Sequence, residues 1–203
     1  MGPGRCTLRA TEGLPISLPD RLALFRVLLV PAIIGLVLAT AHTEVAHLFG
    51  FAAFLVAVAA FTDYLDGAIA RKRGITTVLG AFLDTTADKI LVSGALIALV
   101  SVDRASVWVT VIIMTREFVV MAVRSVVAID GGVVPASVAG KIKAAVQFMA
   151  LGLAMLRLDQ AWGPWFLDQY WMWLAAAVTI VSGWDYLVRF RQALKDVDRP
   201  VGT

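Results

Sequence analysis

Long apolar segments alternate with short polar ones along the 203-residue chain. Each apolar segment is close to the about 20 residues that a helix needs to cross a bilayer. The pattern predicts an all-α polytopic membrane protein, with residues 1–17 as a flexible cytoplasmic tail, 18–192 as one helical domain and 193–203 as a cytoplasmic C-terminal tail. The six expected transmembrane helices are Leu22–Thr40, Val45–Ala70, Val78–Val102, Ala105–Ala128, Ser137–Leu156 and Tyr170–Phe190.

Composition supports a membrane protein and argues against nucleic-acid binding. Hydrophobic residues make up 60% of the chain and the mean hydropathy is +0.83. Charged residues make up 16%, against about 25% in soluble domains. The pI of about 9.3 comes from basic residues at the ends of apolar segments, not from a basic patch with interleaved aromatic residues. Cys6 is the only cysteine, which excludes a disulfide framework and a thiolate metal site.

The distribution of basic residues predicts the orientation. With both termini in the cytoplasm, nearly all Lys and Arg residues fall on the cytoplasmic side, and only Arg104 and Arg157 fall outside. A group of tryptophans around residues 162–173 fits an aromatic belt at the outer interface. We expect an integral protein of the cell (inner) membrane.

The strongest chemical signal is a run of carboxylates next to apolar sequence. Asp63 and Asp66 lie on one face of a predicted helix, and Asp84 and Asp88 lie on one face of the next. A short basic turn at 71–74 joins the two helices, so we expect them to be antiparallel neighbours with the four carboxylates converging. Carboxylates near a membrane interior are costly and usually functional.

This ligand set predicts a site for hard cations. Carboxylate oxygens suit Mg²⁺ or Mn²⁺ rather than zinc, and four of them can hold two ions, the arrangement used in phosphoryl chemistry. Gly67, Ala70 and Gly80 lie on the same faces and leave room for a bulky ligand. The alternative interpretation is a solvated, charged turn between two transmembrane helices. Because the cluster lies at the cytoplasmic ends of its helices, the site is expected to open to the cytoplasm.

A second group of charges is basic. A pocket formed by these side chains would bind an anionic substrate, most simply a phosphate. The alternative is that they flank the spans and contact lipid phosphates. Glu117 is expected to pair with Arg116 or with another helix. The basic group comprises Arg116, Arg124, Lys141 and Lys143.

The acidic segment matches a known signature. Residues 63–88 follow the pattern D-x2-D-G-x2-A-R-x8-G-x3-D-x3-D at every fixed position. This resembles the signature of the CDP-alcohol phosphatidyltransferases. Segments 19–31, 115–118 and 140–147 are similar to the phosphatidylglycerophosphate synthase branch of that family, although Asp20 and Ala23 replace the usual Asn and Thr.

The resemblance implies roles for these residues. It implies transfer of a phosphatidyl group from CDP-diacylglycerol to sn-glycerol 3-phosphate, with CMP as the other product. Asp88 would be the catalytic base as well as a metal ligand, beside the metal ligands Asp63, Asp66 and Asp84. The acceptor phosphate would bind Arg116, Lys141 and neighbouring cations, and the protein would be a homodimer among membrane lipids. The CDP nucleotide would be held by Gly67, Ala70, Arg71 and Gly80.

Two alternatives remain open from the sequence. The same chemistry with inositol phosphate, or another alcohol, as acceptor would need a similar basic pocket. A small cation transporter could use the four Asp residues as an ion site, but it would be expected to place that site near the midplane and to show inverted repeats. No internal repeat is visible in the sequence.

Overall fold

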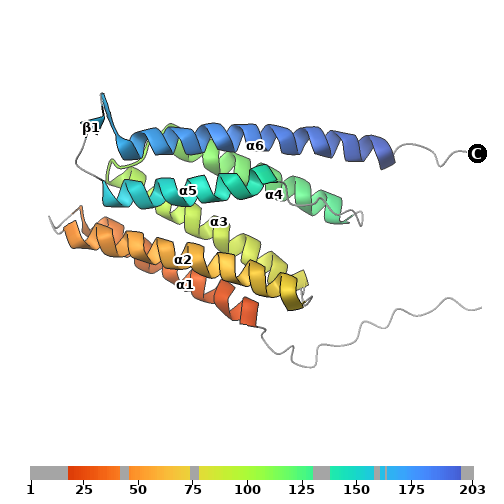
Figure 1. The fold of residues 1–203 in the computed structure, drawn as a ribbon, viewed down its shortest axis with the longest axis horizontal. Helices are drawn as coiled ribbons and strands as arrows, with labels where there is room; N and C mark the ends of the chain where they lie inside the picture. Colours follow the sequence, from red (N-terminus) through yellow and green to blue (C-terminus); the bar gives the residue numbers. More distant parts are fainter. Residues whose placement is uncertain are drawn as a thin grey trace, which may run out of the picture.

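The computed structural model describes residues 18–41, 46–73, 78–129, 138–157, 161–162 and 164–197. In these ranges the fold is all-helical apart from one short hairpin, as predicted (Figure 1). The predicted tail 1–17 lies outside the described residues. The elements are α1 (Leu18–Ala39), α2 (Ala46–Arg73), α3 (Val78–Ser101), α4 (Val107–Ile129), α5 (Val138–Leu156), β1 (Ala161–Trp162), β2 (Trp165–Phe166) and α6 (Leu167–Val197).

The helices run alternately up and down, with their axes roughly along the long axis of the molecule (Figure 1). The C-terminal ends of α1, α3 and α5 lie at the same end of the bundle as the hairpin, here called the hairpin end (Figure 1). Arg104 joins α5 and α2 at this end. Its guanidinium donates to the carbonyl of Met155 at 3.1 Å and lies 3.7 Å from the centre of the Phe49 ring. The guanidinium of Arg157 lies 4.8 Å from the centre of the Phe166 ring in β2, so Arg104 and Arg157 lie at the same end of the bundle. The side of the membrane that this end faces remains a prediction.

The hairpin was not predicted. The segment 157–168 was expected to be a loop, but β1 and β2 pair as antiparallel strands with Trp162 opposite Trp165. Helix α6 then begins at Leu167, before the predicted start at Tyr170. It continues to Val197, so residues 193–197, which were assigned to the tail, are helical.

The packing order of the helices differs from the expected one. We expected α2 and α3 to be direct neighbours, but in the described residues α1 packs extensively against both of them. Helix α2 also packs against α5, and α6 packs against α4 and α5. Short connections do not dictate which helices share the most surface, because the apolar faces decide this once several helices are present.

Gly94 allows α1 and α3 to approach closely. A Cβ at this position would lie 2.9 Å from Cγ1 of Val30 and 3.1 Å from Cδ1 of Ile34, both on α1. Val30 is β-branched and buried, so it has little freedom to move aside. The lack of a side chain at Gly94 is thus a packing requirement of the α1–α3 contact.

Two described segments, Arg21–Ala39 and Leu167–Val188, are long and apolar enough to cross a membrane. The apolar parts of α2 and α5, His47–Asp63 and Ile142–Leu156, are shorter. Charged residues interrupt the apolar sequence of α3 and α4 near their midpoints. Large apolar side chains are nevertheless exposed around the bundle, for example Leu28, Trp108, Val181 and Trp184. Six membrane crossings remain a prediction.

We expect Gly94→Ala to destabilise the protein relative to Gly152→Ala. Both changes replace a helical glycine and gain the same intrinsic helix propensity of about 1 kcal/mol. A Cβ at Gly152 would meet nothing within 4 Å, whereas one at Gly94 would press on Val30. Overpacking of this kind costs about 1–3 kcal/mol. Thermal unfolding in detergent would measure the difference, and equal melting temperatures would contradict the packing role of Gly94.

Candidate active site

An ion pair between α1 and α2 holds the first of the four predicted metal ligands. Nη1 of Arg26 lies 3.1 Å from Oδ1 of Asp63. The Arg26 side chain is 0% exposed and that of Asp63 is 38% exposed. A buried guanidinium is tolerated only when it is paired, and Asp63 supplies a carboxylate for this arginine. In return, Arg26 restricts where the Asp63 carboxylate can lie.

Asp88 occupies a different environment. It lies on α3 beside the fully buried Ala87, and its Oδ1 atom is buried with no hydrogen-bond partner among the described residues. The charges of Asp63, Lys143, Lys89 and Glu117 all act on this carboxylate. Asp63 on α2 is thus close enough to influence Asp88 on α3 electrostatically. The convergence of the four carboxylates on one site remains a prediction.

These two carboxylates suit a divalent cation. A buried carboxylate oxygen with no partner is a costly feature unless a cation or a substrate group satisfies it. Oxygen-only ligands fit Mg²⁺ or Mn²⁺. Within the described side chains, no group of three or more Asp, Glu, His or Cys residues gathers around one point.

The remaining members of the acidic segment lie in helices, but their side chains are outside the part that the structure describes. The same holds for Lys141 near the start of α5. Their predicted roles stay predictions. These positions are Asp66, Gly67, Ala70 and Arg71 on α2 and Gly80 and Asp84 on α3.

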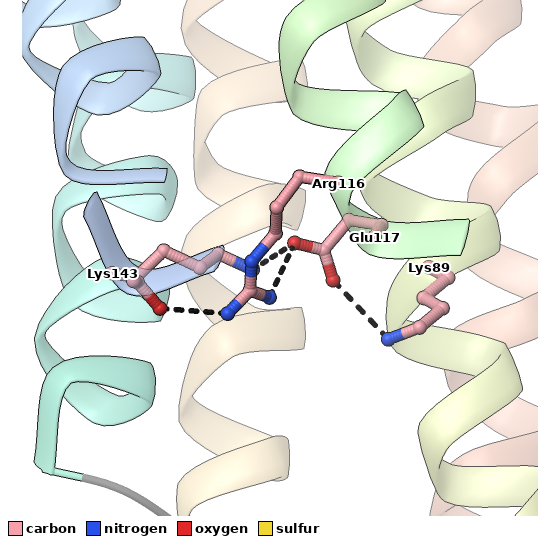
Figure 2. A network of polar contacts seen from close by, with 5 residues as sticks. Lys89, Arg116, Glu117 and Lys143 are labelled. Carbon is pink, nitrogen blue, oxygen red and sulfur yellow. Dashed lines mark hydrogen bonds and ion pairs between the residues drawn. The ribbon is translucent and has the colours of Figure 1, made fainter. Parts of the chain in front are cut away.

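The basic group is organised around a buried carboxylate. Figure 2 shows Glu117 of α4 between Lys89, Arg116 and Lys143. Oε2 of Glu117 lies 3.2 Å from Nζ of Lys89, and Oε1 of Glu117 lies 3.2 Å from Nη1 of Arg116. The Oε1 atom also accepts a hydrogen bond from Nζ of Lys143. The two pairings foreseen for Glu117, with Arg116 and with other helices, both occur.

Arg116 is held from a second side by α6. Its Nη2 atom donates to Oγ of Ser182 at 2.6 Å. A Cβ on the next residue, Gly183, would lie 3.0 Å from Cγ of Arg116. The polar cluster of Lys89, Arg116, Glu117, Lys143 and Ser182, here called the Glu117 cluster, therefore joins α3, α4, α5 and α6.

Arg124 does not join this cluster. Its guanidinium lies 5.5 Å from the centre of the Tyr186 ring, and Arg124 is exposed. Tyr186 is buried on α6, so Arg124 covers one face of its ring. Of the four predicted acceptor-binding cations, the described structure brings together Arg116 and Lys143, and it places Arg124 apart from them.

Sequence reasoning assigned no site role to Arg26, Lys89 or Ser182. Arg26 was counted among the basic residues of the cytoplasmic side and lies in the segment 19–31 that resembles the synthase branch. It also stands inside an otherwise apolar segment, which is a signal of a buried partner. Lys89 directly follows Asp88, and a lysine in that position of an apolar helix gives the same signal. Ser182 gave no sequence signal, because a serine in an apolar helix is common.

Residues 16–181 match the profile of the family described as CDP-alcohol phosphatidyltransferase. The chain is 39% identical over 192 residues to the CDP-diacylglycerol–glycerol-3-phosphate 3-phosphatidyltransferase of Bacillus subtilis, a match covering 88% of this chain and 97% of that protein. It is 39% identical to a probable phosphatidylglycerophosphate synthase of Mycobacterium tuberculosis, covering 89% and 83%. The Escherichia coli enzyme with the same name as the Bacillus one is 34% identical, covering 89% and 98%.

The fold is similar to that of a solved structure. The crystal structure of phosphatidylinositol phosphate synthase from Mycobacterium tuberculosis in its apo form has a TM-score of 0.56 and 23% identity, covering 83% of this chain and 86% of that one. The profile match spans most of the chain and includes the whole acidic segment. The chain therefore belongs to the CDP-alcohol phosphatidyltransferase family, as the signature predicted, and is an enzyme.

Proposed function

We propose that this enzyme transfers the phosphatidyl group of CDP-diacylglycerol to sn-glycerol 3-phosphate, giving phosphatidylglycerophosphate and CMP. The Glu117 cluster is the observation that carries the choice of a phosphate-bearing acceptor. It combines three cations with one carboxylate beside Asp88, and an anion is the ligand that such a surplus of positive charge favours. The names of the relatives that are 34–39% identical support the same acceptor.

The reaction exchanges one phosphorus–oxygen bond for another. A hydroxyl oxygen of the acceptor bonds to the phosphorus that carries the diacylglycerol. The bond from that phosphorus to the bridging oxygen breaks, and CMP leaves with the bonding electrons. The hydroxyl proton goes to a carboxylate, for which Asp88 is our candidate, since its Oδ1 is buried and accepts no hydrogen bond from any described residue.

The other residues bind and orient the substrates. Asp63, Asp66, Asp84 and Asp88 would hold Mg²⁺ or Mn²⁺, and two such ions would neutralise charge on the diphosphate. Arg26 holds Asp63 in place from α1. The nucleotide would lie against Gly67, Ala70, Arg71 and Gly80, and the acceptor phosphate against Arg116, Lys143 and Lys141. Arg124, which lies over Tyr186, would have to turn away from that ring to take part.

We also propose that all six helices cross the membrane, with the site on the cytoplasmic side and the protein a homodimer. The exposed apolar side chains around the bundle support the spans, and the asymmetry of basic residues supports the orientation. A site at that surface would meet both a lipid donor in the inner leaflet and a water-soluble acceptor.

A second candidate is transfer to inositol phosphate. The solved structure with a similar fold is named as a synthase of that kind, but 23% identity supports only the fold. A phosphate-binding cluster would serve either acceptor. The identities of the glycerol 3-phosphate enzymes are higher, and they favour that acceptor.

Purified protein with CDP-diacylglycerol and Mg²⁺ is expected to release CMP with sn-glycerol 3-phosphate but not with inositol phosphate or serine. Asp88→Asn should lower the rate by about 10²–10⁴-fold, the usual contribution of a general base. Asp168→Asn is the matched control, because Asp168 is also a buried carboxylate but lies at the hairpin end, 4.0 Å from Arg157. Release with inositol phosphate alone would refute the proposed acceptor.

The Arg26–Asp63 pair predicts an asymmetric effect on stability. Asp63→Asn removes the charge of a carboxylate that pairs with a fully buried guanidinium, and breaking a buried ion pair from one side costs about 3–5 kcal/mol. Arg26→Met should lower the free energy of unfolding by less, because the side chain of Asp63 is 38% exposed and its carboxylate can be hydrated. Arg26→Met should still lower CMP release about 100-fold, the effect of misplacing a reacting group by roughly 1 Å.

Melting temperature and CMP release, measured on the same preparations, would test both statements. A variant Asp63→Asn that melts at or above the temperature of Arg26→Met would contradict the asymmetry. Wild-type activity in Arg26→Met would show that Asp63 does not depend on Arg26 for its position.

A further inference from the structure

Glu117 has no role in the transfer as proposed so far, yet its buried carboxylate contacts three cations. Its carboxylate pairs with Lys89 of α3, Arg116 of α4 and Lys143 of α5. The Glu117 side chain is 6% exposed, that of Lys143 is 7% exposed, and those of Lys89 and Arg116 are 14% exposed. Solvent therefore contributes little to keeping these charges in place.

The charges of the Glu117 cluster do not cancel. Within the Glu117 cluster, three cations and one anion leave a formal charge of +2. This count does not include the neighbouring Asp88, whose carboxylate is proposed to bind the metal ions and the acceptor's proton. Without Glu117 the same cations would carry +3 and would repel one another in a poorly hydrated region, where such repulsion is strong. Glu117 thus makes a compact arrangement of cations possible, and it leaves a surplus for a ligand to neutralise.

The size of that surplus fits one phosphate monoester. Such a group carries about −1.5 to −2 at pH 7 and offers three acceptor oxygens. A phosphate monoester would bring the cluster close to neutrality, whereas an uncharged alcohol such as glycerol or inositol would leave the charge of +2 buried. Charge matching therefore favours acceptors that already carry a phosphate.

The geometry also fixes where the cations point. Arg116 donates through Nη1 to Glu117 and through Nη2 to Ser182, and the missing side chain at Gly183 leaves space for its stem. Lys143, on a flexible four-carbon stem, has its ammonium group fixed by Glu117. Arg116 and Lys143, two of the three cations proposed to bind the acceptor phosphate, are thus oriented through contacts with one carboxylate.

We propose that Glu117 is a positioning residue for the acceptor: it holds Lys143 and Arg116 in place for the acceptor's phosphate and sets the cluster's charge to match a phosphate monoester. This inference rests on the proposed function, in which those two cations bind that phosphate. Glu117 itself touches neither substrate in this scheme.

The test separates acceptor binding from donor binding. The Michaelis constant for sn-glycerol 3-phosphate should rise about 10- to 100-fold in Glu117→Gln, the equivalent of one lost charged hydrogen bond. The Michaelis constant for CDP-diacylglycerol should change less than about twofold, a difference too small to count as a lost contact. Glu117→Asp should recover part of the loss, because it restores the charge on a shorter side chain. Asp168→Asn, at the hairpin end, should leave both constants unchanged.

Binding without turnover gives a second readout. In the absence of CDP-diacylglycerol, sn-glycerol 3-phosphate should raise the melting temperature of the wild-type protein, and Glu117→Gln should reduce that rise. If Glu117→Gln does not fold, Ser182→Ala tests the proposal in its place. This variant removes the hydrogen bond from Nη2 of Arg116 while Glu117 remains. It should raise the Michaelis constant for the acceptor and leave that for CDP-diacylglycerol unchanged.

Three results would overturn the proposal. Equal changes in both Michaelis constants would show that Glu117 only stabilises the bundle. A lower Michaelis constant for sn-glycerol 3-phosphate in Glu117→Gln would show that Glu117 competes with the phosphate. Unchanged constants in either Glu117→Gln or Ser182→Ala would show that the cluster does not bind the acceptor. If the wild-type protein instead uses inositol phosphate, the proposed acceptor is wrong, and the same comparison made with inositol phosphate decides the role of Glu117.

Discussion

The structure depends on the pairing of charges inside a bundle made mostly of apolar side chains. A charge removed from water in such a place costs several kcal/mol unless a partner of opposite sign lies within contact distance. Glu117 meets this requirement for three cations at once, and Asp63 meets it for Arg26. Each pairing joins different helices, apart from the one between neighbours Arg116 and Glu117. The charges therefore fix helix positions as well as the site.

The two sets of charges differ in their access to solvent. Asp63, which pairs with Arg26, has a side chain that is 38% exposed. The Glu117 cluster carries surplus positive charge, and Asp88 beside it has a buried oxygen without a hydrogen bond from any described group. Surplus charge and an unsatisfied buried oxygen favour the binding of ions and charged substrates. In the proposed function, a diphosphate with its cations would bind at Asp88, and a phosphate-bearing acceptor would bind at the Glu117 cluster.

Much of the fold follows from the sequence, because apolar segment length and the polar breaks between them set the number of helices. The acidic pattern puts Asp63 and Asp88 each on a defined helix face, since helical spacing alone determines this. That all four carboxylates of the pattern converge remains a prediction. Partners across helices could not be found in this way. Lys89 and Lys143 lie 28 and 26 residues from Glu117, and Ser182 lies 66 residues from Arg116. The periodicity within one helix does not reveal which side chain of another helix will contact a given residue. The placement of α1 against both α2 and α3 was missed for the same reason.

Helix α3 connects the two chemical halves of the site. Asp88 and Lys89 are consecutive, so they point in directions about 100° apart around the helix axis. Lys89 reaches Glu117 on α4, while Asp88 shares an electrostatic environment with Asp63 on α2. A rotation of α3 would move the candidate base and one of the three cations of the Glu117 cluster together. The close contact of Gly94 with Val30 on α1 opposes such a rotation, and it lies between one and two turns further along the same helix. The packing of α1 against α3 thus helps to keep the candidate base in register with the cations proposed to bind the acceptor.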